Sequence, residues 1–212
     1  MTATCDCGEP HPERRIVLTG GPGAGKTAVL ELVRHTCCRH THVLPEAAGI
    51  LFGGGFPRAS SARIQRAAQR AIFFTQRELE ASVPPGVVTL CDRGTIDGAA
   101  YWPGPEDLWA SVGSSRAEQL LRYDAVIHLR TPAPDRGYDR SNPLRIETAA
   151  EAAAIDERIL AAWDGHPRRH VVEATPDFLA KVQRALALLR EELPACCSAS
   201  RSLRSVGPPA LR

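Results

Sequence analysis

The residues best suited to do chemistry lie in one glycine-rich stretch near the start of the chain, Gly20-Gly21-Pro22-Gly23-Ala24-Gly25-Lys26-Thr27. The stretch fits the spacing G-x-x-x-x-G-K-S/T. Its glycines allow the backbone to curl with the N–H groups inward, and they leave no Cβ to obstruct a phosphate. Lys26 would reach the β- and γ-phosphates of a nucleotide, and the Thr27 hydroxyl would ligate Mg²⁺. The residues predicted to bind the nucleotide are Gly21, Gly23, Ala24, Gly25, Lys26 and Thr27.

A carboxylate follows a second apolar run farther along the chain. Residues 87–91 are Val-Val-Thr-Leu-Cys, and Asp92 comes directly after them. A continuous apolar run is typical of a parallel strand that is covered on both faces. Chemistry in such proteins takes place at the carboxyl ends of the strands, where P-loop proteins hold their magnesium. We therefore predict that Asp92 and Thr27 bind Mg²⁺. A helix N-cap or an ordinary loop carboxylate is the alternative for Asp92.

The elements that must position these residues alternate along the chain. Apolar runs predict strands at 16–19, 42–45, 87–91, 124–129 and 171–172. Helical periodicity and capping signals predict helices from 26 to about 38, from 60 or 61 to about 81, from 148 to about 163 and from 175 to 193, with two short helices within 95–122. Gly53-Gly54-Gly55 and Pro57 indicate a mobile loop. The alternation predicts an α/β P-loop NTPase fold of three layers around a roughly five-stranded parallel sheet.

Length and composition limit the function classes. The 212 residues suit a single domain at 14–193, with a flexible lead-in at 1–13 and a disordered tail at 194–212. The net charge of +2 gives no electrostatic basis for general nucleic-acid binding. We find neither an apolar run of about 20 residues nor an apolar signal segment, so we expect a cytoplasmic protein without a transmembrane segment. The seven cysteines are odd in number and include adjacent pairs, so we expect free thiols rather than a metal site.

The segment from Arg130 to Arg145 carries several arginines between the predicted fourth strand and the next helix. In small P-loop kinases a lid loop occupies this position, and its cations neutralise the charge on the transferring phosphoryl group. The chain is too short to add the lid domain or sensor helices of an oligomeric ATPase. No guanine-recognising N-K-x-D motif is present, which disfavours a standard GTPase. The choice between ATP and GTP stays open.

Further motifs give the chain a more specific resemblance. They are Pro45-Glu46-Ala47-Ala48, Asp92-Arg93-Gly94, Asn142-x-x-Arg145-x-Glu147, Asp156 and Trp163-x-x-His166-Pro167. With the glycine-rich stretch, they cover residues 14 to about 190. Over this range the chain resembles a small P-loop family that is classed as an AAA-type domain but is closer in kind to kinases. That family groups the ribosylnicotinamide kinase domain of NadR with the nucleotide-binding domain of the TRPL translocation defect protein. Deoxynucleoside and thymidylate kinases share the broader layout.

The resemblance implies roles for the acidic residue and the arginine that follow the second and third strands. Glu46 would lie near the acceptor hydroxyl as a general base or as a ligand to metal-bound water. A helix-capping carboxylate is the alternative. Arg93 would hold the acceptor or its phosphate through a bidentate fork. Both residues are therefore predicted to bind the acceptor.

The later motifs would act on the triphosphate. Arg145, with Arg140 or Arg136, would clamp the γ-phosphate, and Glu147 would orient Arg145 by a salt bridge. A purely structural ion pair is the alternative for Arg145 and Glu147. Asn142 would contact a base or cap a turn, and both Asn142 and Glu147 are predicted to bind the substrate. Trp163 and His166 are expected in the core rather than in the chemistry.

Two functions follow from this combination. The first is a phosphotransferase that moves the γ-phosphate of ATP or GTP to a nucleoside-like or other hydroxyl-bearing acceptor, with Lys26, Glu46, Asp92 and Arg145 as catalytic residues. The second is a nucleotide-dependent switch with slow hydrolysis, whose mobile segments are ordered by the γ-phosphate. The identity of the acceptor and the oligomeric state stay open.

Overall fold

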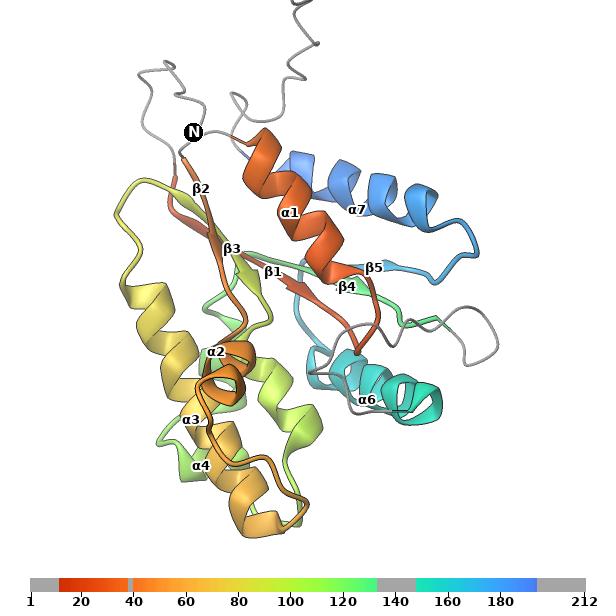
Figure 1. Ribbon diagram of the computed structural model, residues 1–212. Coiled ribbons are helices and arrows are strands. Elements are labelled where there is room, and N and C mark those ends of the chain that lie inside the picture. Colours follow the sequence, from red (N-terminus) through yellow and green to blue (C-terminus); the bar gives the residue numbers. More distant parts are fainter. Residues whose placement is uncertain (1–11, 38–39, 133–147, 194–212) are drawn as a thin grey trace, which may run out of the picture.

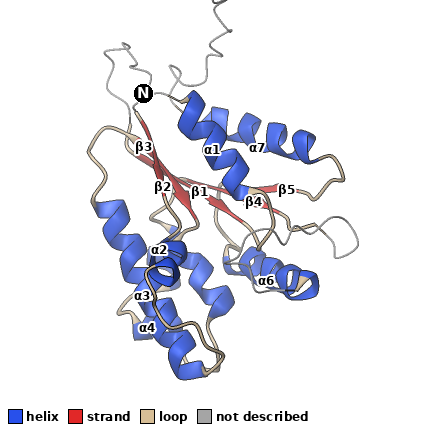
Figure 2. Ribbon diagram, viewed as in Figure 1, coloured by secondary structure: helices blue, strands red, loops and turns tan. Residues whose placement is uncertain are grey.

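The central sheet has five strands, and all of its strand pairs are parallel (Figures 1 and 2). The computed structural model describes residues 12–37, 40–132 and 148–193. The strands are β1 (Arg14–Thr19), β2 (Thr41–Leu44), β3 (Val88–Asp92), β4 (Ala125–Leu129) and β5 (Arg169–Val172). Their order in the sheet is β2-β3-β1-β4-β5. The central strands β1, β3 and β4 are mostly apolar, as expected for parallel strands that are covered on both faces.

Helices cover both faces of the sheet (Figure 1). One face carries α1 (Lys26–Thr36) and α7 (Phe178–Glu192), which pack on Ile16, Leu18 and their neighbours. The opposite face carries η1 (Thr95–Tyr101) and α6 (Ala149–Ala162), which pack on Val17 and Val126. The remaining helices on this side are α2 (Ala47–Gly53), α3 (Ala62–Ala81), α4 (Leu108–Ser111) and α5 (Arg116–Leu120). The predicted three-layer α/β architecture is confirmed.

Some local predictions differ from the structure. Helix α2 was not predicted, because its seven residues include two glycines and are too short to show a clear period. The region 95–122 contains three short helices rather than two. Helix α7 begins after Asp177, whose carboxylate accepts a hydrogen bond from the Ala180 N–H at 3.0 Å, so Thr175 is not its cap. The apolar side chains of Phe178 and Leu179 at the start of α7 are 49% and 70% exposed, although the helix as a whole is amphipathic.

The capping signal at the start of α6 is confirmed. Helix α6 begins with the predicted capping box, in which the Glu151 N–H donates to the Thr148 hydroxyl at 3.2 Å and the Thr148 N–H donates to the Glu151 carboxylate at 2.7 Å. No helix within the described residues is both long and apolar enough to span a bilayer. Cys37 and Cys91 form no disulfide, and the other five cysteines lie outside the described residues.

Because every strand is parallel, all of the carboxyl ends lie along one edge of the sheet. Strand β1 leads there into the glycine-rich loop, β2 into Glu46 and β3 into Arg93, while β4 leads into Arg130. Segments that are far apart in the sequence are therefore brought together at this edge.

Candidate functional site

The glycine-rich loop between β1 and α1 has a backbone that only glycine adopts easily at three positions. Gly20 has φ 132°, Gly23 has φ 76° and Gly25 has φ 95°. A Cβ at Gly20 would lie 2.0 Å from the Leu129 carbonyl oxygen, so the loop also packs directly on the end of β4. Gly25 is the N-cap of α1, and the N-terminus of that helix opens toward the same loop. The loop therefore has the glycine conformations and the following helix expected of a P-loop.

Lys26 lies inside this loop. Its ammonium donates hydrogen bonds to the Gly20 carbonyl at 2.9 Å and to the Gly21 carbonyl at 3.1 Å. Burial and the neighbouring Arg93 guanidinium lower the pKa of Lys26 to about 8, although nearby carboxylates oppose the shift. The ammonium is thus a poorly hydrated cation, and an anion in the loop would stabilise its charged form.

Asp92 closes β3 beside the loop. Its Oδ1 is buried and has no hydrogen-bond partner among the described residues. Burial raises the pKa of Asp92 to about 6, against the lowering effect of Lys26. Asp92 and Thr27 line the same cleft. A hard divalent cation prefers oxygen ligands of this kind, so an unpartnered carboxylate oxygen in the same cleft as a hydroxyl fits Mg²⁺.

Glu46 and Arg93 form an ion pair across the mouth of the loop. Arg93 Nε lies 2.6 Å from Glu46 Oε1, and Arg93 Nη1 donates to the Gly20 carbonyl at 3.1 Å. The Arg93 backbone has φ 70°, an unusual value for a residue with a side chain, and its N–H donates to the Leu18 carbonyl at 3.1 Å. Glu46 is the N-cap of α2 but makes no side-chain cap, so the helix-cap alternative is wrong.

The charge state of Glu46 follows from these neighbours. Burial alone would raise the pKa of Glu46, but the charges of Arg93 and Lys26 outweigh it and lower the pKa below its ordinary value. Glu46 is therefore ionised at neutral pH, whereas the pKa of Asp92 is about 6. Two carboxylates at one site are thus tuned in opposite directions.

One cleft contains all of these groups. It has a volume of about 790 Å³, within the usual range for small-molecule sites. Lys26, Thr27, Glu46, Asp92 and Arg93 line it, and so do residues of α2, α3, η1 and α6. The structure therefore brings together, in one cleft, the predicted residues at the carboxyl ends of β1, β2 and β3. The cleft extends beyond these residues.

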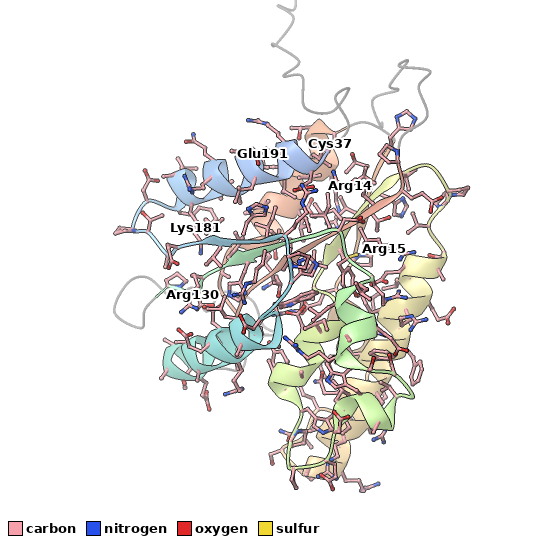
Figure 3. The ribbon with its side chains drawn as sticks, turned by 180° about the vertical axis from the view of Figure 1, so that it is seen from behind. Arg14, Arg15, Cys37, Arg130, Lys181 and Glu191 are labelled. Atoms are coloured by element: carbon pink, nitrogen blue, oxygen red, sulfur yellow. The ribbon has the colours of Figure 1, made fainter. Side chains whose placement is uncertain are left out.

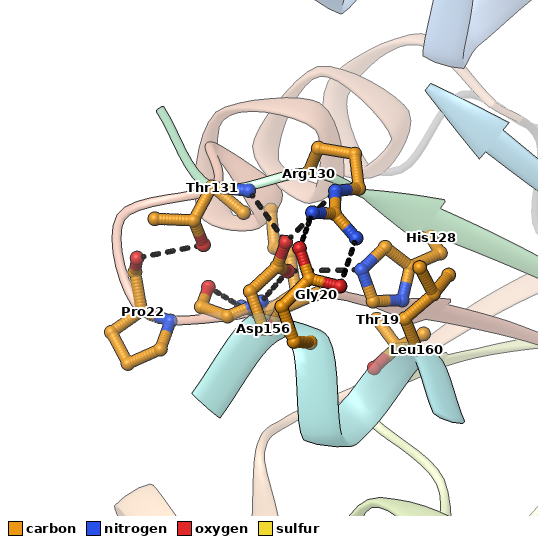
Figure 4. Close-up of polar contacts among 12 residues, drawn as sticks. Thr19, Gly20, Pro22, His128, Arg130, Thr131, Asp156 and Leu160 are labelled. Carbon is orange, nitrogen blue, oxygen red and sulfur yellow. Dashed lines mark hydrogen bonds and ion pairs between the residues drawn. The ribbon is translucent and has the colours of Figure 1, made fainter. Parts of the chain in front are cut away.

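The back of the loop is held by a carboxylate on α6. Asp156 accepts hydrogen bonds from the Gly21 N–H at 2.7 Å and the Thr131 N–H at 3.2 Å (Figure 4). His128 Nε2 donates to it at 2.9 Å, and Arg130 Nε lies 3.1 Å away. In the sequence, Asp156 is recognisable only as part of a family motif. Its position on the buried stripe of α6 is the signal that could have revealed a structural role.

Lys181 on α7 holds the loop from the other side. Its ammonium donates to the Ala24 carbonyl at 2.8 Å and also to the Arg130 carbonyl; Figure 3 labels both Lys181 and Arg130. Burial lowers the pKa of Lys181 to about 8. Lys181 was not among the predicted site residues, although a lysine between the buried positions of an amphipathic helix was a usable signal. The chain has only two lysines, Lys26 and Lys181, and both bind carbonyls of this loop.

Trp163 and His166 lie in the core, as predicted. Trp163 packs edge-on against Tyr123, with ring centroids 5.4 Å apart, and against His166. His166 Nε2 donates to the Tyr123 carbonyl at 2.9 Å. The predicted residues of the arginine-bearing loop lie outside the described residues and stay predictions: Arg136, Arg140, Asn142, Arg145 and Glu147.

Comparison with known families agrees with this geometry. The model of the AAA domain family matches residues 15–180. No curated protein matches the chain. The matched range includes the glycine-rich loop, Glu46, Asp92, Arg93 and Asp156. Because the match covers most of the chain and the fold is that of a P-loop protein, the chain belongs to the AAA domain family.

Proposed function

We propose that the protein is a phosphotransferase that moves the γ-phosphate of ATP or GTP to a small hydroxyl-bearing acceptor. One observation carries this proposal: the cleft that contains Lys26, Glu46 and Asp92 continues past the P-loop to α2, α3 and η1. A protein that only hydrolyses a nucleotide does not need the additional room that this cleft leaves beside the P-loop. A P-loop with a carboxylate pair and an adjoining cavity suits a reaction between two bound substrates.

Each residue at the P-loop end has a proposed role. Lys26 binds the β- and γ-phosphates, together with the N–H groups of the loop. Glu46 accepts a hydrogen bond from the acceptor hydroxyl and orients its oxygen toward the γ-phosphorus. A new O–P bond then forms as the bond to the β-phosphate oxygen breaks, the hydroxyl proton passes to Glu46, and the nucleoside diphosphate leaves.

Arg93 positions Glu46 through their ion pair, and we propose that it also contacts the acceptor. Thr27 and Asp92 are the residues that would hold Mg²⁺, which supplies charge neutralisation at the phosphates when bound. In the loop outside the described residues, we assign the γ-phosphate clamp to Arg145. Glu147 orients that arginine, and Asn142 contacts the substrate.

Glu46→Gln and Asp92→Asn test the assigned chemistry. Each variant removes a charge without changing the side-chain shape, so we expect phosphoryl transfer to fall by about 100-fold while Mg-ATP binding is partly retained. The measurement is transfer of label from γ-labelled ATP to a panel of nucleosides and other alcohols, beside titration with Mg-ATP and Mg-GTP. Glu31→Gln on the exposed face of α1 is a matched control and should transfer at the parent rate.

Parent-like transfer in both variants would contradict these roles. Saturable nucleotide binding with no labelled acceptor, together with a partner that binds only the loaded protein, would instead support the nucleotide-dependent switch. The presence or absence of a labelled acceptor, measured on the same protein preparation as nucleotide binding, therefore separates the two functions.

The lowered pKa of Lys26 predicts a pH dependence of nucleotide binding. The charged form binds phosphate, and in the free protein this form is lost as the pH rises through about 8. ATP binding measured without a divalent cation should therefore weaken by up to about tenfold per pH unit above pH 8. Calorimetric titration from pH 7 to pH 10 measures the effect. A constant ATP affinity of the parent protein from pH 7 to pH 10 would contradict the assignment of Lys26 as the cation that binds the phosphates.

A further inference from the structure

A third carboxylate lies beside the P-loop, and the proposed reaction does not use it. Asp97 is a buried residue of η1 that lines the same cleft as Glu46 and Asp92. Its Oδ1 accepts a hydrogen bond from the Thr19 hydroxyl, and its Oδ2 accepts one from the Gly94 N–H at 2.8 Å. Burying a carboxylate costs free energy unless hydrogen bonds and a cation compensate for the lost water. The hydrogen bonds of Asp97 are thus accounted for, and its cation is the next question.

The two hydrogen bonds tie Asp97 to the ends of two central strands. Thr19 is the last residue of β1 and leads into the P-loop, while Gly94 comes two residues after the end of β3. A Cβ at Gly94 would lie 2.9 Å from the Trp163 ring, so the turn after β3 is packed tightly on the core. The Asp97 carboxylate is therefore fixed relative to both strands.

The Arg93 guanidinium lies between this fixed carboxylate and Glu46. Arg93 Nη1 is 3.5 Å from Asp97 Oδ1 and 3.1 Å from the Gly20 carbonyl oxygen, while Arg93 Nε is 2.6 Å from Glu46 Oε1. The Asp97 side chain is 4% exposed, whereas the Glu46 side chain is 37% exposed. Charges attract more strongly where water is excluded. Asp97 thus holds the guanidinium from the buried side, and the guanidinium holds the more exposed Glu46.

We propose that Asp97 is a positioning residue, which fixes Arg93 against the P-loop so that Arg93 can fix Glu46 for the acceptor hydroxyl. This inference rests on the proposed phosphotransfer, in which the hydroxyl proton passes to Glu46. Once Glu46 carries that proton, it no longer neutralises Arg93. Asp97 then remains as an anionic partner of the buried guanidinium, and it keeps Arg93 in place until Glu46 releases the proton.

Asp97→Asn tests the charge of this residue without changing its shape. The asparagine oxygen can accept from the Gly94 N–H, and its NH₂ group can donate to the Thr19 hydroxyl oxygen, so only the attraction to Arg93 is lost. We expect kcat for transfer from γ-labelled ATP to fall by about 10- to 100-fold, because the acceptor oxygen is held less precisely. The KM for Mg-ATP should stay within about threefold of the parent, since no contact to the P-loop is removed.

Thr95→Val is a matched control on the same element. Thr95 is as buried as Asp97, and its hydroxyl donates to Gln119 at 2.9 Å rather than to a residue of the site. Valine leaves the Gln119 oxygen without this donor, so the variant should melt at a lower temperature than the parent. Its kcat should nevertheless stay within about threefold of the parent. This control separates a general loss of stability around η1 from a loss of positioning.

A double-mutant cycle shows whether Asp97 acts through Arg93. Arg93→Met removes the guanidinium and should itself lower kcat. In that background, Asp97→Asn should change kcat by less than about threefold, because the group that it positions is already absent. A merely structural role for Asp97 would instead give the same 10- to 100-fold loss in both backgrounds.

Hydrogen exchange of the Arg93 Nε–H measures the positioning without any substrate. Its NMR signal is assigned by its disappearance in Arg93→Met. In Asp97→Asn this hydrogen should exchange about tenfold faster than in the parent, because the guanidinium leaves Glu46 more often. Thr95→Val should exchange at the parent rate.

Three results would each overturn the role of Asp97. They are a parent-like kcat in Asp97→Asn, an equal loss of kcat with and without Arg93, and an unchanged exchange rate of the Arg93 Nε–H. Absence of transfer by the parent to any acceptor, despite tight Mg-ATP binding, would overturn the phosphotransferase instead. Faster exchange in Asp97→Asn would then still support the hold of Asp97 on Arg93, so the two proposals can fail separately.

Discussion

Lys26→Met is expected to lower the kcat/KM of phosphoryl transfer by about 10³-fold or more and to weaken binding of ATP and GTP. Lys26 is the one lysine that lines the described cleft, and its ammonium lies inside the P-loop against the Gly20 and Gly21 carbonyls. Methionine fills most of the same volume but supplies no charge for the developing negative charge on the phosphoryl oxygens. Single-turnover transfer and titration with each Mg-nucleotide measure the two effects separately.

Lys26→Arg and Lys181→Met make this prediction specific. Arginine keeps the charge but cannot fit its planar fork into a space built for a compact ammonium, so we expect it to fail as well. Lys181→Met removes the other buried lysine, which binds the loop from outside the cleft lining, and it should reduce stability more than transfer. Tight nucleotide binding by Lys26→Met would remove the basis for the functional assignment and leave only the fold.

Asp156→Ala is expected to destabilise the protein by about 3 kcal/mol, which corresponds to about 6–12 °C in Tm for a chain of this size. The variant leaves a buried His128, the Arg130 guanidinium and the N–H groups of Gly21 and Thr131 without their shared acceptor. Since Gly21 belongs to the P-loop, nucleotide binding should weaken together with stability. Thermal melts with and without Mg-ATP measure both effects.

Glu157→Gln is the matched control, because Glu157 pairs with the same arginine but is exposed on α6. Exposed ion pairs contribute little, so this variant should melt within about 2 °C of the parent. Burial would raise the pKa of Asp156, but His128 and two backbone N–H groups lower it overall. Its stabilisation is therefore present at neutral pH and is lost on acidification, and Asp156→Ala should be less acid-sensitive than the parent. Equal melting of Asp156→Ala and Glu157→Gln would contradict the proposed anchoring role.

Much of the fold could be predicted because its signals are local. The β1 run, the P-loop glycines and the α1 pattern are contiguous, and Asp92 directly follows a strand with an unmistakable apolar sequence. Parallel pairing then places these residues at one edge of the sheet without any further information. The capping box at Thr148 is equally local, and the structure confirms it.

The contacts between distant segments could not be predicted in this way. Glu46 and Arg93 are 47 residues apart, and Gly21 and Asp156 are 135 apart, so no window of sequence contains either pair. Family resemblance marked Asp156 without giving its partner.

The use of lysine has a practical consequence for chemical labelling. The protein has no exposed lysine in its described surface, since Lys26 and Lys181 are both buried. Acylating reagents attack the neutral amine, and a pKa of about 8 gives each side chain a substantial neutral fraction near physiological pH. A nucleotide-shaped acylating probe would therefore find its lysine targets only around the phosphate loop, and covalent occupancy of Lys26 could be read by mass spectrometry with little side-chain amine background.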